Sequence, residues 1–269
     1  MNRKDTTQTK LLQIKHLSHS FQLRDRQVPI LHDIDFSLDE DEVVSIVGLS
    51  GCGKTTLIKI LAGLITPSSS HRIEVSWKGH QAVLSTVAKN IAYMPQTSSL
   101  LPWRTVIDNI ALPLKVRQQK PIAYTRKIAA DLLKEFELEQ WALHYPAALS
   151  GGMASRISFL RASAQRQPLL LLDEPFGALD AISREKAQQW LEVAWQEQGN
   201  AGIFVTHSLS EAVAMGDRVI VMGKRGKPLA GEISVNLPRP RDTQVRTSTE
   251  FATILRKVTE LLERVGKSY

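Results

Sequence analysis

The amino-acid sequence predicts an α/β protein whose core is a parallel β-sheet, interrupted by a mostly helical segment. Short apolar runs that suit buried strands recur along the chain, at residues 42–47, 169–172, 202–205 and 218–222. A glycine-containing loop and a helical pattern follow the first of these runs. Strands that alternate with helices are typical of parallel sheets, because parallel neighbours need a crossover connection.

The N-terminal third is predicted to be rich in strands. Strand-like patterns begin at residue 11 and continue in three pieces to residue 47. The helix after the glycine-containing loop covers about residues 54–64, and the sequence TPSSS marks its end. Two shorter strand-like pieces follow, at residues 72–77 and 90–93.

The middle of the chain, from about residue 98 to 165, changes to helical periodicity. One helix there carries its apolar residues on a single face, at Ile128, Leu132, Leu133 and Phe136. Prolines punctuate the region at positions 102, 113, 121 and 146. We therefore expect a helical insert between strands of the parallel sheet.

The C-terminal part runs from about residue 232 through a proline-rich segment, LPRPR, into a final helix. Thr247 and Glu250 fit a capping box at the start of that helix. Seven apolar residues form a stripe at helical spacing: Phe251, Ile254, Leu255, Val258, Leu261, Leu262 and Val265. The stripe either packs against the chain's own core, which we favour, or forms an interface with a partner.

The composition is that of an ordinary globular protein, with 43% hydrophobic and 23% charged residues in a chain of 269. The net charge of +7 has three candidate explanations: nucleic-acid binding, contact with an anionic membrane, or solvated Lys and Arg without a partner. The basic residues cluster only at 224–227 and 239–246, and no aromatic residues alternate with them. We favour the third explanation.

Cysteine content and the lack of long apolar runs limit the cellular setting. Cys52 is the single cysteine, which excludes an internal disulfide and suits a reducing compartment. No window of about 18 apolar residues occurs, so we expect any link to a membrane to come through another protein.

A phosphate-binding loop is the strongest motif in the chain. Residues 48–55, GLSGCGKT, match G-x-x-x-x-G-K-S/T, with an apolar strand before and a helix after. Glycines let several backbone N–H groups point at one anion, and the helix N-terminus adds partial positive charge. Lys54 can reach the β- and γ-phosphates of a nucleotide, and Thr55 can offer its hydroxyl to Mg²⁺. The expected nucleotide-binding residues here are Gly48, Leu49, Ser50, Gly51, Cys52, Gly53, Lys54, Thr55 and Thr56.

An acidic pair ends the predicted strand at residues 169–172. A buried parallel strand presents its last residues at the carboxyl edge of the sheet, where ligands bind in open α/β folds. Asp173 is therefore placed to hold Mg²⁺, directly or through water. Glu174 is expected to point the other way and to orient or deprotonate an attacking water. Read alone, the pair could also be two solvated acids, but the phosphate loop upstream weakens that reading.

A second anion site precedes this strand by about twenty residues, where residues 149–153 read LSGGM. Ser150, Gly151 and Gly152 offer a hydroxyl and bare N–H groups at a helix start. Here the chain resembles the ATP-binding cassette (ABC) ATPases, whose signature sequence is LSGGQ. In that family two ATP molecules lie between the phosphate loop of one subunit and the signature of the other.

The resemblance extends to further elements in the same order. Phe21 matches the aromatic residue that stacks on adenine, although a core phenylalanine is an equal alternative. Gln96 matches the glutamine whose side chain meets Mg²⁺ and the attacking water. Asp180, in GALD, matches the loop that reaches across the dimer, and His207 matches the switch histidine that contacts the γ-phosphate. The resemblance thus implies that the catalytic residues are Glu174, His207 and Lys54. It implies that Thr55, Gln96 and Asp173 bind Mg²⁺.

The resemblance implies a P-loop NTPase core with a parallel sheet, an antiparallel β-subdomain and a helical subdomain. The ATPase domain would span residues 11–235, with the helical subdomain at about 98–165, and residues 236–269 would form a C-terminal segment with an amphipathic helix. ATP and Mg²⁺ are the implied cofactors. The implied partners are integral-membrane permease subunits, a solute-binding protein indirectly, and a second copy of the chain in an ATP-dependent head-to-tail dimer. Nucleic acid is not expected, and the implied location is the cytoplasmic face of the inner membrane.

Two features refine this expectation. Residues 100–114 and the LPRPR segment resemble the corresponding segments in ATP-binding subunits of importers. These importers take up nitrate, sulfonates, taurine and related solutes, including pyrimidine precursors. Leu100 and Trp103 would then be apolar contacts for the membrane subunit, unless they pack internally. The chain departs from the family after the signature, where Ala154 and Ser155 replace a common Arg-Gln pair. We still expect ATP hydrolysis, because Glu174 and the phosphate ligands are in place.

Three alternatives remain at this point. A soluble ABC ATPase acting on DNA or ribosomes would need a long coiled-coil insertion or tandem cassettes, which the chain lacks. A regulatory module that holds ATP without turnover is kept open by Ala154 and Ser155. The third alternative is a P-loop kinase or a GTPase; guanine specificity would need an N-K-x-D type element, and none is found.

Overall fold

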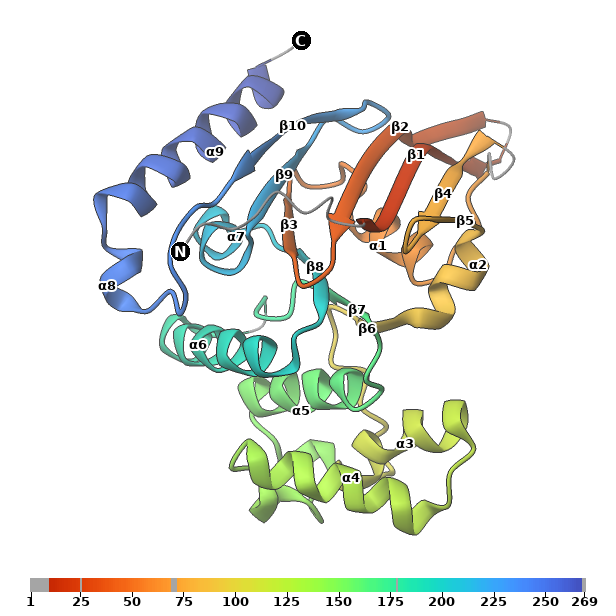
Figure 1. Ribbon diagram of the computed structural model, residues 1–269, viewed down its shortest axis with the longest axis vertical. Helices are drawn as coiled ribbons and strands as arrows, with labels where there is room; N and C mark the ends of the chain where they lie inside the picture. Colours follow the sequence, from red (N-terminus) through yellow and green to blue (C-terminus); the bar gives the residue numbers. More distant parts are fainter. Residues whose placement is uncertain (1–9, 25, 69–71, 178, 268–269) are drawn as a thin grey trace.

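The computed structural model describes residues 10–24, 26–68, 72–177 and 179–267, and Figure 1 shows how they are arranged. The strands form two sheets. The larger sheet contains β3 (Val43–Val47), β6 (Ile91–Met94), β7 (Leu169–Asp173), β8 (Ala201–Val205), β9 (Arg218–Met222) and β10 (Leu229–Ser234). The smaller sheet contains β1 (Lys10–Leu23), β2 (Arg26–Asp39), β4 (Glu74–Trp77) and β5 (His80–Ala82).

The larger sheet has the strand order β10-β9-β3-β8-β7-β6. Its strands are parallel except for β10, which pairs antiparallel with β9 at one edge. Every residue of β3, β7 and β8 is buried. This explains why these strands appear in the sequence as continuous apolar runs. The predicted parallel sheet is confirmed, and β3, the strand before the phosphate loop, lies inside it.

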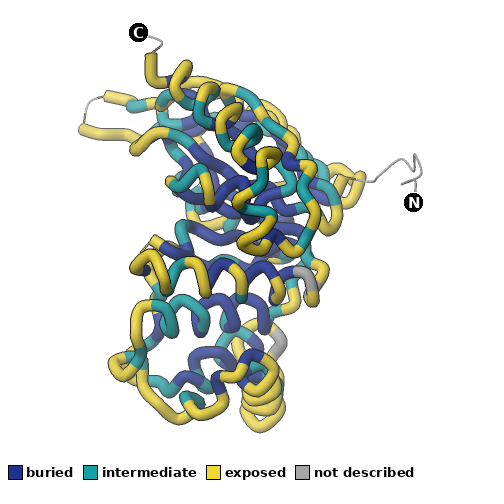
Figure 2. The backbone as a smooth tube through the Cα atoms, turned by 90° about the vertical axis from the view of Figure 1, so that its left-hand side faces the viewer, coloured by how far each residue is buried: buried dark blue, intermediate teal, exposed yellow. Residues whose placement is uncertain are grey.

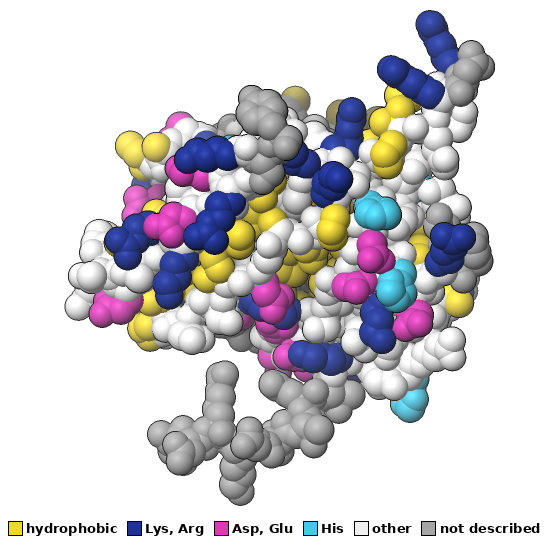
Figure 3. Space-filling model, turned by 90° about the horizontal axis from the view of Figure 1, so that it is seen from above, with side chains coloured by type: hydrophobic (Ala, Val, Ile, Leu, Met, Phe, Trp, Pro, Cys, Tyr) yellow, Lys and Arg dark blue, Asp and Glu magenta, His cyan; other side chains and the backbone are white. Residues whose placement is uncertain are grey.

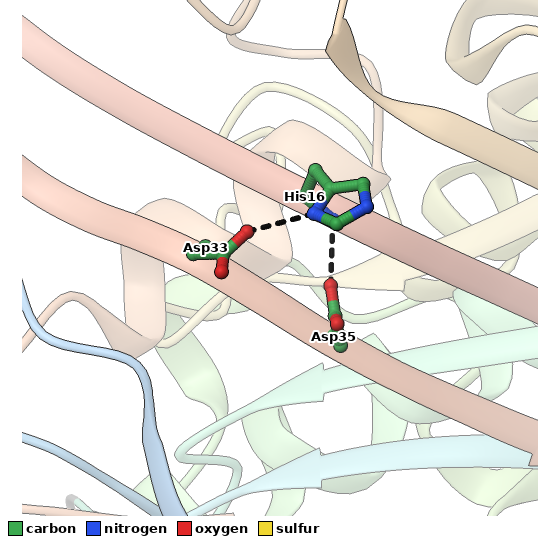
Figure 4. Close-up of side chains that lie close together, drawn as sticks. All are labelled: His16, Asp33 and Asp35. Atoms are coloured by element: carbon green, nitrogen blue, oxygen red, sulfur yellow. Dashed lines mark hydrogen bonds and ion pairs between the residues drawn. The ribbon is translucent and has the colours of Figure 1, made fainter.

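The smaller sheet is antiparallel, in the order β2-β1-β4-β5. The ladder between β1 and β2 is interrupted around His16, whose backbone is left-handed at φ 59°. Asp35 Oδ1 accepts the His16 backbone N–H at 2.6 Å, and Asp33 Oδ1 lies 2.9 Å from His16 Nδ1 (Figure 4). Two carboxylates of β2 thus hold the irregular part of β1 in place.

The helices divide into two groups. Figure 1 shows α3 (Val106–Gln118), α4 (Ile122–Glu135) and α5 (Gly151–Ser163) gathered in the lower half of the molecule. This group is the predicted helical insert. The helices around the larger sheet are α1 (Lys54–Leu61), α6 (Ala181–Gln198) and α7 (Leu209–Met215), while α2 (Leu84–Val87) follows the smaller sheet.

Figure 2 shows that the buried parts of the chain run through the interior of the molecule. The core lies on both faces of the larger sheet. Alternate residues of β7 point to opposite faces. Leu170 and Leu172 join a cluster with the helical insert, whereas Leu169 and Leu171 join a cluster with α1 and the smaller sheet. The sheet therefore separates two hydrophobic layers, and its carboxyl edge lies between them.

The loop between β6 and α3 is fixed by a buried asparagine. The Asn109 amide donates to the carbonyls of Leu101 and Arg104, at 3.2 and 3.1 Å, and its Oδ1 accepts the Leu101 N–H at 2.7 Å. Leu100 belongs to the core with 9% of its surface exposed, so the expectation that it is a surface contact is wrong. Trp103, in contrast, is 70% exposed.

The C-terminal segment is part of the core. In α9 (Thr249–Lys267), the apolar stripe packs against residues of β9, β10 and α7, which confirms the favoured interpretation. The predicted capping box of Thr247 and Glu250 is wrong, because Ser248 is the N-cap and the residue three positions later is Phe251, which cannot complete such a box. Ser248 Oγ accepts the Phe251 N–H at 3.1 Å, while the Thr247 hydroxyl donates back to the carbonyl of Thr243 in α8 (Thr243–Arg246).

The basic cluster at residues 239–246 is not solvated, contrary to our expectation. Arg241 is 1% exposed and donates to the carbonyls of Val213 and Val235, at 2.9 and 3.2 Å. Glu192, buried in α6, accepts from the Arg239 side chain at 3.3 Å and from the Arg241 N–H at 2.8 Å. Burial lowers the pKa of Arg241 to about 10, so the guanidinium stays charged at neutral pH. These arginines therefore attach the C-terminal segment to α6 and α7.

Figure 3 shows one face of the molecule, which carries charged side chains of both signs. On the face seen from above, basic side chains alternate with acidic ones (Figure 3). Among the helices of the described residues, none combines the length and apolar character needed to cross a membrane.

Candidate functional site

The phosphate loop joins β3 to α1 and needs glycine for its shape. Gly51 has φ 75° and Gly53 has φ 113°, both in the left-handed region that favours glycine. A Cβ at Gly53 would lie 2.8 Å from Leu31 Cδ2, whereas one at Gly51 would meet nothing within 4 Å. The loop can therefore curl over the start of α1 only with glycine at position 53.

Lys54 lies in the curve of this loop. Its side chain is largely buried, and its Nζ donates to the carbonyl of Gly48 at 2.9 Å and to that of Leu49 at 3.2 Å. Cys52 is also buried, and burial raises the pKa of its thiol. A neutral buried thiol offers little to a phosphate, so Cys52 can contribute only its backbone N–H group.

Asp173 ends β7 beside the start of α1. Its Oδ1 accepts from the Thr55 hydroxyl and its Oδ2 accepts from the Tyr93 hydroxyl, both at 3.3 Å. Burial raises the pKa of Asp173, and the two hydrogen bonds oppose that rise. Burial also raises the pKa of Tyr93, and the neighbouring carboxylate adds to the effect. Tyr93 was not predicted as a site residue, and its place three positions before Gln96 was the only available signal.

Glu174 is turned away from Asp173 by a left-handed backbone at φ 46°. Its Oε2 accepts from Gln96 Nε2 at 2.9 Å and lies 3.4 Å from His207 Nδ1. Its own N–H donates to the Val205 carbonyl at 2.8 Å, which ties the turn to β8. The structure thus brings together Glu174, Gln96 and His207, three residues from separate loops at the carboxyl edge of the sheet.

A cavity of about 580 Å³ opens above the phosphate loop. It is lined by Ile30, Gly48, Ser50, Gly51, Gly53, Lys54, Thr55, Thr56, Gln96, Glu174 and His207. Donors suited to phosphate lie on one side of this cavity and a carboxylate with two polar neighbours lies on the other. Of the predicted residues, Leu49, Cys52 and Asp173 border the loop or the strand end without lining the cavity.

Phe21, on β1, is 39% exposed, so the alternative of a core phenylalanine is wrong. Its ring and that of His19 form a T-shaped contact with centroids 4.6 Å apart. His19 Nδ1 accepts the Ser68 N–H at 3.2 Å, and burial lowers the pKa of His19. A largely buried histidine thus packs against the partly exposed Phe21 ring, a contact that the sequence alone did not indicate.

The signature residues lie elsewhere in the chain. Ser150 caps α5, and its Oγ accepts the Met153 N–H at 3.3 Å. Figure 1 shows α5 in the helical group, well apart from α1. Asp180 caps α6 by accepting from Ile182 and Ser183, and the bond with Ser183 lowers its pKa. Ser150, Gly151, Gly152, Asp180 and Phe21 are thus not brought to the cavity within one chain.

Ser155, one of the two residues that depart from the family pattern after the signature, contacts the turn that carries Glu174. The Ser155 hydroxyl donates to the Pro175 carbonyl at 2.6 Å, one residue after Glu174. The Arg156 guanidinium lies over the Trp190 ring at 5.5 Å. Ser155 therefore links α5 to the turn that holds Glu174. Ala178, in the GALD loop, lies outside the described residues.

Comparison with known proteins agrees with this geometry. The profile of the family described as "ABC transporter" matches residues 31–177. The chain is 42% identical to the aliphatic sulfonates import ATP-binding protein SsuB 2 of Pseudomonas fluorescens, over 88% of this chain and 81% of the relative. It is 39% identical to the SsuB protein of Escherichia coli, over 85% of each. A solved dimer of the ATP-binding cassette MJ0796 with ADP and Pi is 30% identical, with a TM-score of 0.72 over 84% of this chain and 99% of that one.

Proposed function

Because the chain belongs to the ABC transporter ATP-binding proteins, we propose that it powers an importer of small aliphatic sulfonates or chemically similar anions. The chain is an ATPase of the ABC transporter type. The observation that carries the catalytic assignment is the position of Glu174, whose carboxylate contacts Gln96 and His207 at the cavity above the phosphate loop.

Magnesium fits the residues at the strand end. Asp173 is a buried carboxylate, and the Thr55 hydroxyl donates to one of its oxygens. Carboxylate, hydroxyl and amide oxygens are the ligands that Mg²⁺ prefers, so Thr55, Asp173 and Gln96 would hold it. When bound, Mg²⁺ would neutralise charge on the β- and γ-phosphates.

The chain's own residues would divide the work of hydrolysis. The N–H groups of residues 48–56 would bind the phosphates, and Lys54 would exchange its loop carbonyls for phosphate oxygens. Phe21 would stack on adenine. Glu174 would accept a proton from the attacking water, which Gln96 orients. His207 would donate a hydrogen bond to the γ-phosphoryl group, so that developing charge is stabilised at the transition state.

A head-to-tail dimer would complete the site. The signature residues do not line the cavity of their own chain, so a second chain would supply Ser150, Gly151 and Gly152 to the γ-phosphate. The Asp180 loop would meet the partner subunit. ATP would favour this closed state because it contacts both surfaces, and hydrolysis would remove that advantage.

The proposed partners are permease subunits at the cytoplasmic face of the inner membrane, with a solute-binding protein acting indirectly. The 70% exposed Trp103 offers an apolar contact for a permease segment. The names of the relatives favour sulfonate as the solute, although the ATPase itself would not touch it. Nucleic acid is not a proposed partner.

The test is Mg-ATP hydrolysis by the purified chain, with Glu174→Gln beside the wild type. Glu174→Gln should keep ATP binding but lose turnover by about 10²–10⁴-fold, the usual contribution of a general base. It should also form an ATP-dependent dimer that Ser150→Arg lacks. Glu40→Gln, at an exposed turn, is the matched control and should behave as wild type. Equal turnover in Glu174→Gln and wild type would contradict the assigned base.

The partner is tested separately by purifying the chain from membranes with its associated proteins. An integral-membrane protein that co-purifies, together with sulfonate uptake that depends on Glu174, would support the importer. ATP binding without turnover, even with that membrane protein present, would instead identify a nucleotide-sensing subunit.

A further inference from the structure

We propose that Glu211 and Arg184 are positioning residues that join the loop carrying His207 to the loop that begins α6. This inference rests on the proposed role of His207 at the γ-phosphate. Neither Glu211 nor Arg184 lines the cavity, so both would act through their neighbours.

Glu211 holds the residues on both sides of His207. Its side chain is buried, and its Oε2 accepts from the Thr206 hydroxyl. The same hydroxyl oxygen accepts the Ser208 N–H at 3.0 Å. Ser208 Oγ in turn accepts the Glu211 N–H at 3.3 Å, which caps α7. The backbone before and after His207 is thus fixed to one carboxylate.

Arg184 connects that carboxylate to α6. Its Nε lies 3.7 Å from Glu211 Oε1, and its Nη2 donates to the Leu179 carbonyl at 2.8 Å. Leu179 directly precedes Asp180, the capping residue of α6. A Cβ at Gly152 would lie 3.6 Å from Leu179 Cδ2, so Leu179 also borders the first turn of α5.

These contacts form a continuous path from the His207 loop to the loop before Asp180 and on to the signature helix. Glu211 is buried whereas Arg184 is about one-third exposed, so separating the two would leave the Glu211 carboxylate in the interior without its cationic neighbour. The two loops would therefore move together when the dimer closes. Such a connection would make γ-phosphate contact by His207 depend on the conformation of the loop that meets the partner subunit.

The test compares Glu211→Gln, Arg184→Gln and the double variant of the full-length chain. Each single variant should lower kcat by about 10- to 100-fold, the usual cost of misplacing a catalytic group, while ATP affinity stays within about twofold. The double variant should be no slower than either single one, because both break the same connection. Wild-type kcat in the singles, or an ATP affinity that falls as much as kcat, would overturn the proposal.

Two further variants separate positioning from general stability. Glu192→Gln removes another buried glutamate that pairs with arginine. Within the described residues, the Glu192 carboxylate contacts Arg239, Arg241 and Arg246 of the C-terminal segment, not the two loops. At temperatures at which the Glu192→Gln variant is folded, its kcat should equal that of the wild type. Thr206→Ser keeps the hydroxyl and should retain activity, whereas Thr206→Val should resemble Glu211→Gln. A loss of kcat in Glu192→Gln equal to that in Glu211→Gln would overturn the proposal.

A measurement that does not depend on ATP hydrolysis separates the positioning role of Glu211 and Arg184 from the proposed catalytic function. The histidine ring signals of ¹³C-labelled chain would be recorded by NMR, and the His207 signal assigned from its loss in His207→Ala. That signal should shift in Glu211→Gln and Arg184→Gln but not in Glu192→Gln. An unchanged signal would contradict the connection even if the wild type hydrolyses ATP. A shift without any wild-type turnover would support the connection while the catalytic proposal fails.

Discussion

At the scale of single residues, backbone conformation decides where the site's functional groups point. Glu174 adopts φ 46°, a conformation that costs a non-glycine residue energy and persists only where neighbours enforce it. Its N–H is bound by Val205 on β8, and its carbonyl accepts the Gly177 N–H at 3.1 Å. The turn therefore directs Glu174 into the cavity while Asp173 remains on the buried side.

Two glycines of the phosphate loop provide a matched pair for a mutational test. Alanine at either Gly51 or Gly53 is forced into left-handed backbone, at a cost of about 1–3 kcal/mol. Only at Gly53 does the added Cβ also collide with Leu31. We expect Gly53→Ala to lose more unfolding free energy and more ATP affinity than Gly51→Ala, as measured by urea denaturation and ATP titration. Equal losses would show that contact with Leu31 is not what restricts position 53.

The sequence predicted the site's residue types well because they lie in contiguous motifs. Residues 48–55 and the pair Asp173–Glu174 could be recognised from local pattern and strand position alone. Tyr93 and His19 could not, since their partners lie 80 and 49 positions away in the chain. Such contacts depend on how strands are ordered in the sheet, which local pattern does not determine.

At the scale of elements, strands were predicted more accurately than helix ends. The end of α1 shows why. Gly63 has φ 73°, and the Leu64 N–H reaches back to the Lys59 carbonyl at 2.9 Å, which closes the helix as a Schellman motif. The helix thus ends at Leu61, three residues before the predicted end. The TPSSS segment predicts a later end, but Gly63, which precedes it, already ends the helix.

The β1–β2 pair should respond to pH through His16. The pKa of His16 is raised, and the largest cause is its hydrogen bond with Asp33. The folded state therefore binds the proton more tightly than the unfolded state. The stabilisation is complete below the unfolded pKa of about 6.5 and is lost as pH rises through the higher folded value.

The measurement is urea unfolding of wild type and His16→Gln at about pH 5.5 and about pH 8.5. We expect the advantage of wild type to shrink at the higher pH. His80→Gln, an exposed histidine on β5 of the same sheet, is the control and should not reproduce this trend. A wild-type advantage that grows with pH would contradict the assigned interaction.

At the scale of the whole molecule, the C-terminal segment belongs to the same structure as the sheet. Arg241 joins the segment to carbonyls at the end of α7, and Glu192 of α6 accepts from both Arg239 and Arg241. The proposed boundary at residue 236 thus separates two stretches that share a core. The sequence could not predict this, because an arginine in a proline-rich segment is typical of solvent-exposed chain.

Loss of this arginine should be costly. Arg241→Met leaves the buried carbonyls of Val213 and Val235 without the guanidinium that donates to them. We expect the variant to lose more unfolding free energy than about 1–3 kcal/mol, the cost of one buried acceptor without its donor. Arg256→Met removes an exposed arginine that pairs with Glu260 in α9, and should lose less than about 0.5 kcal/mol. Circular dichroism during urea unfolding would measure both. Similar losses in the two variants would contradict the structural role of Arg241.

The strand order has a consequence for synthesis of the chain on the ribosome. β3 emerges early, but its neighbours in the sheet are β8 and β9, which end at Val205 and Met222. Until Val205, about three-quarters of the way along the chain, has been translated, the strand that carries the phosphate loop has no partner on either edge, and its second edge waits until Met222, at about four-fifths. An unpaired apolar strand of this kind is prone to wrong pairing during that interval. The nascent chain therefore depends on late-translated residues to protect one of its earliest strands.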